Sequence, residues 1–377
     1  MRRGLEGELL RALVDGGPQT RNQLARSLDV PRTTLSVSLR SLAAAGHVEE
    51  GTLAASSGGR RSLLVRISPR RRVLVVSIGE RRARVVLLDG HLTIANSLSV
   101  DLRDRGTDVD LLAGTVLRAV RQLLGDDVPT AIGTATLDVE SSLHLRVAQQ
   151  VAETYPDTPQ ATIAAVRAMA LGERRAGVAR GTDDLVAIRL GDTVTSTTIS
   201  GGHLDHGASG RAGEIGHLRV EEFGPACTCG LTGCLDSFVS AGALVEQATD
   251  LTRRGRSPAM GPVLERTGTL VLDDLVTAGR SGDPVVAQLA RDLGQRLGRV
   301  VAAQVAQVDP RVVVVGGPVA ALGRQLLGEL RATVYRLAPA RAAEDLDIVL
   351  SELGEQGVAV GAASAAIDAW SMHPTVG

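Results

Sequence analysis

Three cysteines and one histidine stand close together in the second half of the sequence. Cys227, Cys229 and Cys234 are the only cysteines of the chain, and His217 precedes the first of them by ten residues. Three thiolates and one imidazole are a standard tetrahedral ligand set for Zn²⁺, whereas disulfide frameworks usually spread an even number of cysteines over a domain. Glycine and proline around the thiols suit a tight loop that wraps an ion. The spacing therefore predicts a closed, structural Zn²⁺ site.

Two alternatives to this ligand set remain open. Isolated cysteines usually behave as small buried hydrophobes, although the Thr and Gly residues around these thiols have no apolar periodicity of the kind that marks a core face. The fourth ligand is less certain than the thiolates because His203 and His206 also lie near the loop. Only its spacing favours His217.

Charge is distributed unevenly along the chain. All 41 basic residues are arginine, and the net charge is −1. Residues 1–72 contain thirteen Arg and six acidic residues, a net charge of +7, which leaves a net charge of −8 for the remainder. A basic segment attached to an acidic body indicates a module that binds a polyanion.

The basic segment has the pattern of a winged helix-turn-helix. Leucines recur at helical spacing in three successive stretches, and two short strands around a Gly/Ser/Arg loop follow them. Thr20 is placed to cap the second helix, Pro31 to open the third, and Gly46 to end it. Only Asp29 and Val30 separate the second helix from the third, as in a helix-turn-helix.

The third helix is expected to lie in the major groove of double-stranded DNA. Its face opposite the leucines carries polar and basic side chains that can reach bases or phosphates, and the wing tip can reach the minor groove or the backbone. A solvated charged face without a partner is the alternative. The predicted DNA-binding residues are Arg21, Arg32, Thr33, Ser36, Arg40, Arg60 and Arg61.

From residue 71 onwards the pattern is that of a duplicated α/β body. Each half opens with β-branched strands and continues with helices, which predicts two lobes with a cleft between them. The expected strands cover 73–79, 83–90, 130–136, 185–190, 194–199, 312–315 and 347–350, and the expected helices 108–124, 159–176, 283–306, 319–333 and 358–370.

The motif Gly213-Glu-Ile-Gly-His217, followed by Gly224-Pro-Ala-Cys-Thr-Cys-Gly-Leu-Thr-Gly-Cys-Leu-Asp236, resembles the sugar-contacting and zinc-binding motif of the ROK family of repressors and sugar kinases. The N-terminal segment is similar to the winged helix of the repressor branch. The resemblance implies an α/β fold: an N-terminal winged helix-turn-helix followed by a two-lobed, actin-like domain of the ROK sugar-kinase type. The expected domains are 1–70, then 71–175 with the helix at about 358–372 packed back on it, and 176–357.

The chain departs from the kinases of that family at three motifs. Residues 77–82 lack the carboxylate of the first phosphate turn, and residues 191–195 have lost two of three loop glycines. Ala164 and Ala165 stand where the resemblance places an Asn-Asp pair whose Asp is the catalytic base. Without that base we expect no catalytic residue, no ATP and no phosphoryl transfer.

The residues that match the family's sugar-contacting positions are partly retained. Glu214 and His217 match family positions that contact sugar hydroxyls, and Asp236 replaces a Glu that is one methylene longer. The effector could be a sugar, a sugar phosphate held by arginine, or absent, because the hydroxyls that the missing pair would bind lose their partners.

These observations favour a DNA-binding transcriptional regulator, more specifically a repressor of sugar-related genes that binds a palindromic operator as a homodimer or homotetramer. A sugar kinase with an auxiliary DNA-binding domain and a ligand-independent DNA-bound scaffold are the alternatives. No window approaches the ~18 apolar residues of a membrane span, and the start lacks the apolar region of a signal peptide, so we expect a cytoplasmic location.

Overall fold

The structure is a computed structural model that describes residues 4–53, 63–79, 82–102, 108–137 and 142–372. The chain divides into two compact units, one made of Met1–Leu171 with Val358–Gly377 and the other of Gly172–Gly357. Among the described residues, no helix is long and apolar enough to cross a membrane.

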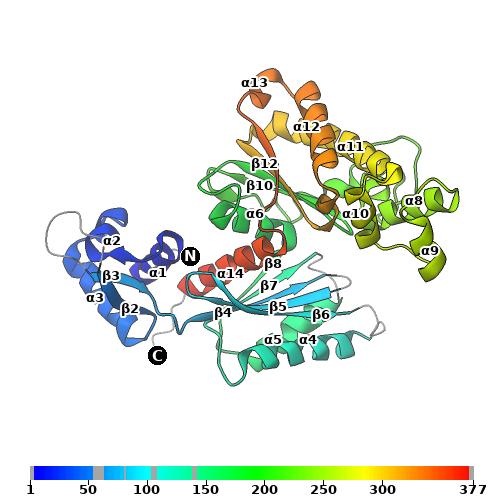
Figure 1. Cartoon of the computed structure of the whole chain (residues 1–377). Coiled ribbons are helices and arrows are strands. Elements are labelled where there is room, and N and C mark those ends of the chain that lie inside the picture. Colours follow the sequence, from blue (N-terminus) through cyan, green and yellow to red (C-terminus); the bar gives the residue numbers. More distant parts are fainter. Residues whose placement is uncertain (1–3, 54–62, 80–81, 103–107, 138–141, 373–377) are drawn as a thin grey trace. The chain divides into compact units, whose positions relative to one another are not determined.

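The first unit begins with a three-helix domain and a small sheet (Figure 1). The strand order in this sheet is β1-β3-β2, and both pairings are antiparallel. The arrangement is a winged helix-turn-helix. Its elements are α1 (Leu5–Gly16), β1 (Gln19–Thr20), α2 (Arg21–Ser27), α3 (Arg32–Ala44), β2 (Val48–Leu53) and β3 (Leu63–Ile67).

Local chemistry explains where these helices begin and end. Thr20 forms a capping box with Gln23, because each side chain accepts a hydrogen bond from the other residue's backbone N–H. Asp29 has a φ of 51° in the turn between α2 and α3, a conformation that Asp tolerates better than most residues. The predicted cap is confirmed, whereas the turn is longer than predicted: α2 ends at Ser27 and α3 begins at Arg32, so four residues separate them instead of two. Leucines from all three helices are buried together: Leu9, Leu10, Leu13, Leu24, Leu35, Leu39 and Leu42.

The remainder of the first unit is a five-stranded sheet with helices on both faces (Figure 1). The strand order is β6-β5-β4-β7-β8, in which β4, β5 and β6 are antiparallel while β4, β7 and β8 are parallel. Its strands are β4 (Arg72–Ile78), β5 (Arg82–Asp89), β6 (Ile94–Asp101), β7 (Ala131–Thr136) and β8 (Gln160–Ala164), and its helices are α4 (Val109–Leu124), α5 (Ser142–Thr154), α6 (Ala165–Ala176) and α14 (Glu355–Met372).

Glycines allow α14 to approach its neighbours closely. A Cβ on Gly133 of β7 would lie 2.5 Å from the carbonyl oxygen of Ala362, and a Cβ on Gly361 would lie 1.7 Å from that of Ala168. Backbone therefore packs directly on backbone at both places. The C-terminal helix is thus held against the sheet of the first unit.

The second unit repeats the same strand plan. Its sheet order is β11-β10-β9-β12-β13, again with an antiparallel half and a parallel half. The predicted duplication is therefore present. Its elements are β9 (Leu185–Leu190), β10 (Val194–Ser200), β11 (His203–Leu204), η1 (Ile215–His217), α7 (Asp236–Val239), α8 (Ala241–Arg253), α9 (Gly261–Thr267), α10 (Leu272–Arg280), α11 (Pro284–Val308), β12 (Val312–Gly316), η2 (Pro318–Leu322), α12 (Arg324–Leu337), α13 (Ala340–Ala343) and β13 (Asp347–Leu350).

Two predicted helices are corrected by the structure. The expected helix 159–176 is wrong over its first six residues, because Gln160–Ala164 pairs with β7 as a parallel strand and helix begins only at Ala165. The expected helix 319–333 is divided at Gly323, whose φ of 82° interrupts helical geometry. In the first case a distant strand overrides the local propensity of an alanine-rich segment.

Candidate functional site

A short irregular loop between η1 and α7 holds the predicted metal ligands. Cys227 N–H donates to the Leu231 carbonyl at 2.7 Å, and Gly230 N–H donates to the Cys227 carbonyl at 3.0 Å, which closes the loop on itself. Gly230 has a φ of 90°, a conformation that a residue with a Cβ rarely adopts. His217 lies at the end of η1, the 3₁₀ helix that precedes the loop.

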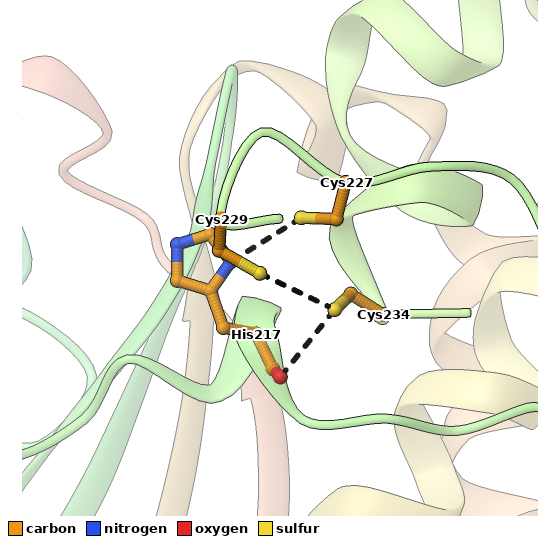
Figure 2. A group of neighbouring side chains, drawn as sticks. All are labelled: His217, Cys227, Cys229 and Cys234. Atoms are coloured by element: carbon orange, nitrogen blue, oxygen red, sulfur yellow. Dashed lines mark hydrogen bonds between the residues drawn. The ribbon is translucent and has the colours of Figure 1, made fainter. Parts of the chain in front are cut away.

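The loop brings the three thiols and His217 together (Figure 2). Their ligand atoms all lie within 4.8 Å of one another. Cys229 Sγ is 3.7 Å from Cys234 Sγ, and Cys227 Sγ is 3.5 Å from His217 Nδ1. A tetrahedral ion with Zn–S bonds of about 2.3 Å and Zn–N bonds of about 2.0 Å has edges of about 3.8 and 3.5 Å. The four residues therefore fit a tetrahedral metal ion.

Burial differs among the thiols. Cys234 is buried and Cys229 is exposed. Burial, with a contribution from the neighbouring thiols, raises the pKa of Cys234 to about 12. Hydrogen bonding, first of all with the Leu231 backbone, lowers the pKa of Cys229. A cation at the centre of the group would favour the thiolate of all three, because metal ligation deprotonates cysteine.

Asp236 and Glu214 differ in how much they remain available to a ligand. Asp236 is only 8% exposed, and its Oδ1 accepts a hydrogen bond of 2.7 Å from the Val194 backbone N–H. Its Oδ2 lies 4.0 Å from His217 Nδ1. Burial raises the pKa of Asp236 and outweighs the opposing effects of Val194 and His217. Asp236 is therefore largely engaged by its own backbone contact, whereas Glu214 is exposed.

The loop between β9 and β10 is a tight turn beside a buried arginine. Gly191 N–H donates to the Thr193 carbonyl at 3.2 Å, and a Cβ on Gly191 would lie 2.7 Å from Arg189 Nη1. Arg189 is buried, with its nearest acidic partner, Glu355, at 3.8 Å, and burial lowers its pKa. An arginine inside an otherwise apolar strand is a signal that the sequence contains, but Arg189 was not among the predicted site residues.

Ala164 and Ala165 occupy the junction between β8 and α6. Ala164 ends the strand and Ala165 starts the helix, so the pair lies at the carboxyl end of a parallel strand. Catalytic groups of α/β proteins commonly lie at such ends. At this junction the chain has two methyl side chains and no proton acceptor.

The predicted DNA-binding residues lie around α3 where the structure describes them. Arg32, Thr33 and Arg40 are exposed on α3. The Ser36 hydroxyl donates to the Arg32 carbonyl at 2.8 Å. Arg21, at the start of α2, is paired with Glu50 at 2.6 Å. The two wing-tip arginines, Arg60 and Arg61, lie outside the described residues.

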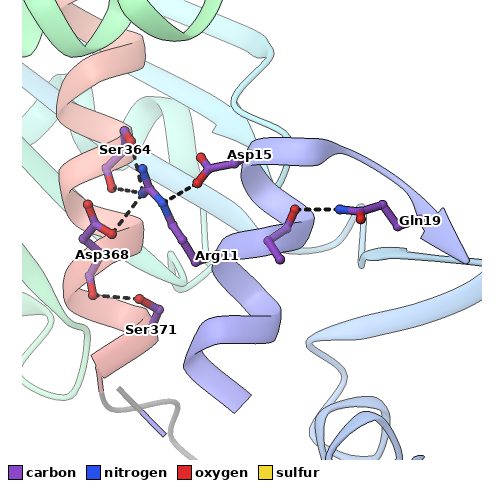
Figure 3. Close-up of polar contacts among 7 residues, drawn as sticks. Arg11, Asp15, Gln19, Ser364, Asp368 and Ser371 are labelled. Carbon is purple, nitrogen blue, oxygen red and sulfur yellow. Dashed lines mark hydrogen bonds and ion pairs between the residues drawn. The ribbon is translucent and has the colours of Figure 1, made fainter. Parts of the chain in front are cut away.

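Contacts with α14 hold the winged helix in the first unit (Figure 3). Arg11 of α1 forms ion pairs with Asp15 at 2.7 Å and with Asp368 at 3.0 Å, and its Nη1 donates to Ser364 Oγ at 3.2 Å. Beside this cluster, the buried rings of His47 and Trp370 meet edge to face, with centroids 5.0 Å apart. None of these contacts was anticipated from the sequence.

A model of the ROK family matches residues 132–369. The chain belongs to the ROK family. Among solved structures, a ROK family transcriptional regulator described as a homologue of E. coli MLC protein covers 99% of this chain and 99% of its own, with a TM-score of 0.82 and 21% identity. The predicted fold class, an actin-like ROK domain behind a winged helix-turn-helix, is confirmed.

Both branches of the ROK family occur among the relatives. A glucokinase of Thermotoga maritima is 30% identical over 197 residues, which are 52% of this chain and 62% of the relative. The DNA-binding transcriptional dual regulator NagC of Escherichia coli K12 is 26% identical over 197 residues, 52% of this chain and 47% of the relative. A glucokinase from Streptomyces griseus, in complex with glucose and AMPPNP, has a TM-score of 0.68 at 25% identity and covers 78% of this ROK chain and 99% of its own. The chain thus spans about half to three fifths of these two curated relatives.

Proposed function

We propose that this ROK protein is a DNA-binding transcriptional regulator, more specifically a repressor, that binds a palindromic operator as a homodimer or homotetramer. The observation that carries the proposal is the two-sided character of α3. Its leucines pack into the winged helix, whereas Arg32 and Arg40 are exposed and the helix contains no acidic residue. Arginines on such a helix can neutralise phosphates and reach base edges.

Three features support the conclusion that the two-lobed ROK domain does not transfer phosphate. The β8–α6 junction has Ala164 and Ala165 where the family resemblance places the catalytic base. Losing a positioned general base typically reduces the rate by about 10²–10⁴. The turn after β9 has lost two of three glycines and carries Asp192, and Glu80 stands in the first phosphate turn, so two acids would repel a nucleotide.

The second candidate function is a sugar kinase with an auxiliary DNA-binding domain, which the glucokinase relatives favour. An assay with ATP and a panel of hexoses, N-acetylhexosamines and pentoses separates the two. We expect no sugar-dependent ADP formation above the rate measured without protein. Turnover that a change of Glu214 abolishes would establish the kinase instead.

We infer that the metal is Zn²⁺ and that its role is structural. The donor set of three thiolates and one imidazole is complete, so no position stays open for a reacting water. When bound, the ion would fix the loop and the orientation of His217. That geometry would in turn fix the edge formed by Glu214 and Asp236, which we propose as the contact for a sugar or sugar-phosphate effector.

DNA binding is tested by selecting duplexes from a random pool with the full-length protein. We expect enrichment of a palindromic sequence whose affinity falls steeply with salt. Arg40→Ala should weaken binding and reduce the slope of log affinity against log salt by about 1 per half-site, whereas Arg180→Ala should not. Failure to enrich any sequence would reject the regulator; a ligand-independent scaffold would bind DNA but respond to no sugar or sugar phosphate.

A further inference from the structure

An exposed valine lies in the middle of the proposed recognition helix. Val37 of α3 is 63% exposed, and the leucines of this helix, Leu35, Leu39 and Leu42, are buried. At about 100° per residue, Val37 points away from the leucine stripe. It lies one turn after Thr33 and about one turn before Arg40, on the face opposite the helical core.

Folding does not explain a valine at this position. A β-branched side chain loses rotamer freedom in a helix, so valine is a weaker helix former than alanine. An exposed valine also gains little from burial of apolar surface. Within the part of the winged helix that the structure describes, Val37 is not part of the buried core, so its side chain is open to whatever α3 binds.

The surroundings of Val37 indicate what that partner is. No residue of α3 is acidic, and Arg32 and Arg40 lie toward the two ends of the helix, so the face suits a polyanion. Near the centre of this face, Val37 is the large hydrophobic side chain that α3 exposes. In the major groove of DNA the C5-methyl group of thymine is the apolar feature of a base edge, and aliphatic side chains contact it.

We propose that Val37 is a specificity-determining residue that contacts a thymine methyl group in each half-site of the operator. The proposal rests on the proposed function, because it requires α3 to lie in the major groove. Arg32 and Arg40 would then set affinity and position through phosphates or guanines, while Val37 selects an A·T pair at one fixed position.

A methyl deletion on each partner tests this pairing. The duplex selected from the random pool is synthesised with deoxyuridine at one symmetric pair of thymines at a time, which removes only the C5-methyl groups. Affinities of the wild-type protein and of Val37→Ala are measured by fluorescence anisotropy on every duplex. Because Val37 is exposed, the variant should fold, and its thermal midpoint should equal or exceed that of the wild type.

We expect one thymine position at which deoxyuridine weakens wild-type binding roughly fourfold per half-site, the effect of leaving one methyl group unburied. Val37→Ala should bind the unmodified duplex more weakly and should lose the deoxyuridine penalty at that position alone. Val128→Ala is the matched control: Val128 is 73% exposed and lies outside the winged helix, so this change should alter neither value.

Two results would overturn the inference, and they differ from each other. If a duplex is selected but the deoxyuridine penalties are the same for wild type and Val37→Ala at every position, the thymine contact is wrong and the regulator stands. If no duplex is selected, the proposed function and the contact fall together.

Discussion

Individual side chains explain why the loop with the three cysteines holds its shape. Asp236 links three parts of the site, since it accepts the Val194 N–H, faces His217 and opens helix α7. Gly216 is required beside it, because a Cβ there would lie 2.2 Å from Asp236 Oδ1. The grouping of the four candidate ligands was readable from the sequence through residue types and spacing. The hydrogen bond from the Val194 N–H to Asp236 was not, since 42 residues separate the two partners.

At the residue scale, Cys229→Ser should remove the metal without disturbing the core, because this thiol is exposed. We expect the zinc content by elemental analysis to fall from one per chain to near zero. The thermal midpoint should fall by about 2–4 °C for a loss of ~1 kcal/mol, the shift typical of a domain of 150–250 residues. Thr228→Ser in the same loop is the control. If Cys229→Ser contains no zinc and still unfolds at the same temperature as the wild type, a structural ion is excluded.

At the scale of elements, the C-terminal helix joins the winged helix-turn-helix to the sheet of the first unit. One side of α14 packs on β7 through Gly133, and the side chains Ser364, Asp368 and Trp370 meet α1 and the start of β2. Helix α14 therefore positions the winged helix. The chain has a single tryptophan, so the fluorescence of Trp370 reports on this contact.

Arg11→Met should weaken the contact between α1 and α14. Arg11 is partly exposed, so solvent screens its two ion pairs, and we expect a loss of only about 1 kcal/mol. Urea denaturation followed by Trp370 fluorescence should show a lower midpoint than wild type, with Arg180→Met as a control. An unchanged midpoint would mean that Arg11 does not stabilise the docked winged helix.

The elements that could be predicted were those whose own residues encode them, through helix-capping residues or a β-branched run. Thr20 and Pro31 mark helix starts through local chemistry, and the β-branched run from Val312 to Val315 marks a buried strand. Strand β8 was missed because only its pairing with β7 makes Gln160–Ala164 extended. Helix α5 was missed as well. The contacts of Arg11 and Trp370 join segments more than 300 residues apart, which no local pattern encodes.

At the scale of the whole molecule, one ROK fold serves two kinds of relative, kinases and DNA-binding regulators. The fold therefore does not decide the function, and the residues at its sites do. In this chain the junction after β8 lacks a base, the turn after β9 carries an acid, and the N-terminal domain presents arginines. This combination favours recognition of DNA over phosphoryl transfer.

The most direct test of this account is a nuclease footprint of the full-length protein on the duplex that it selects. The account predicts two symmetric protected half-sites whose centres lie a whole number of helical turns apart, because a two-fold symmetric assembly presents paired copies of α3 to one side of the duplex. Absence of protection, or a single asymmetric protected site, would contradict it.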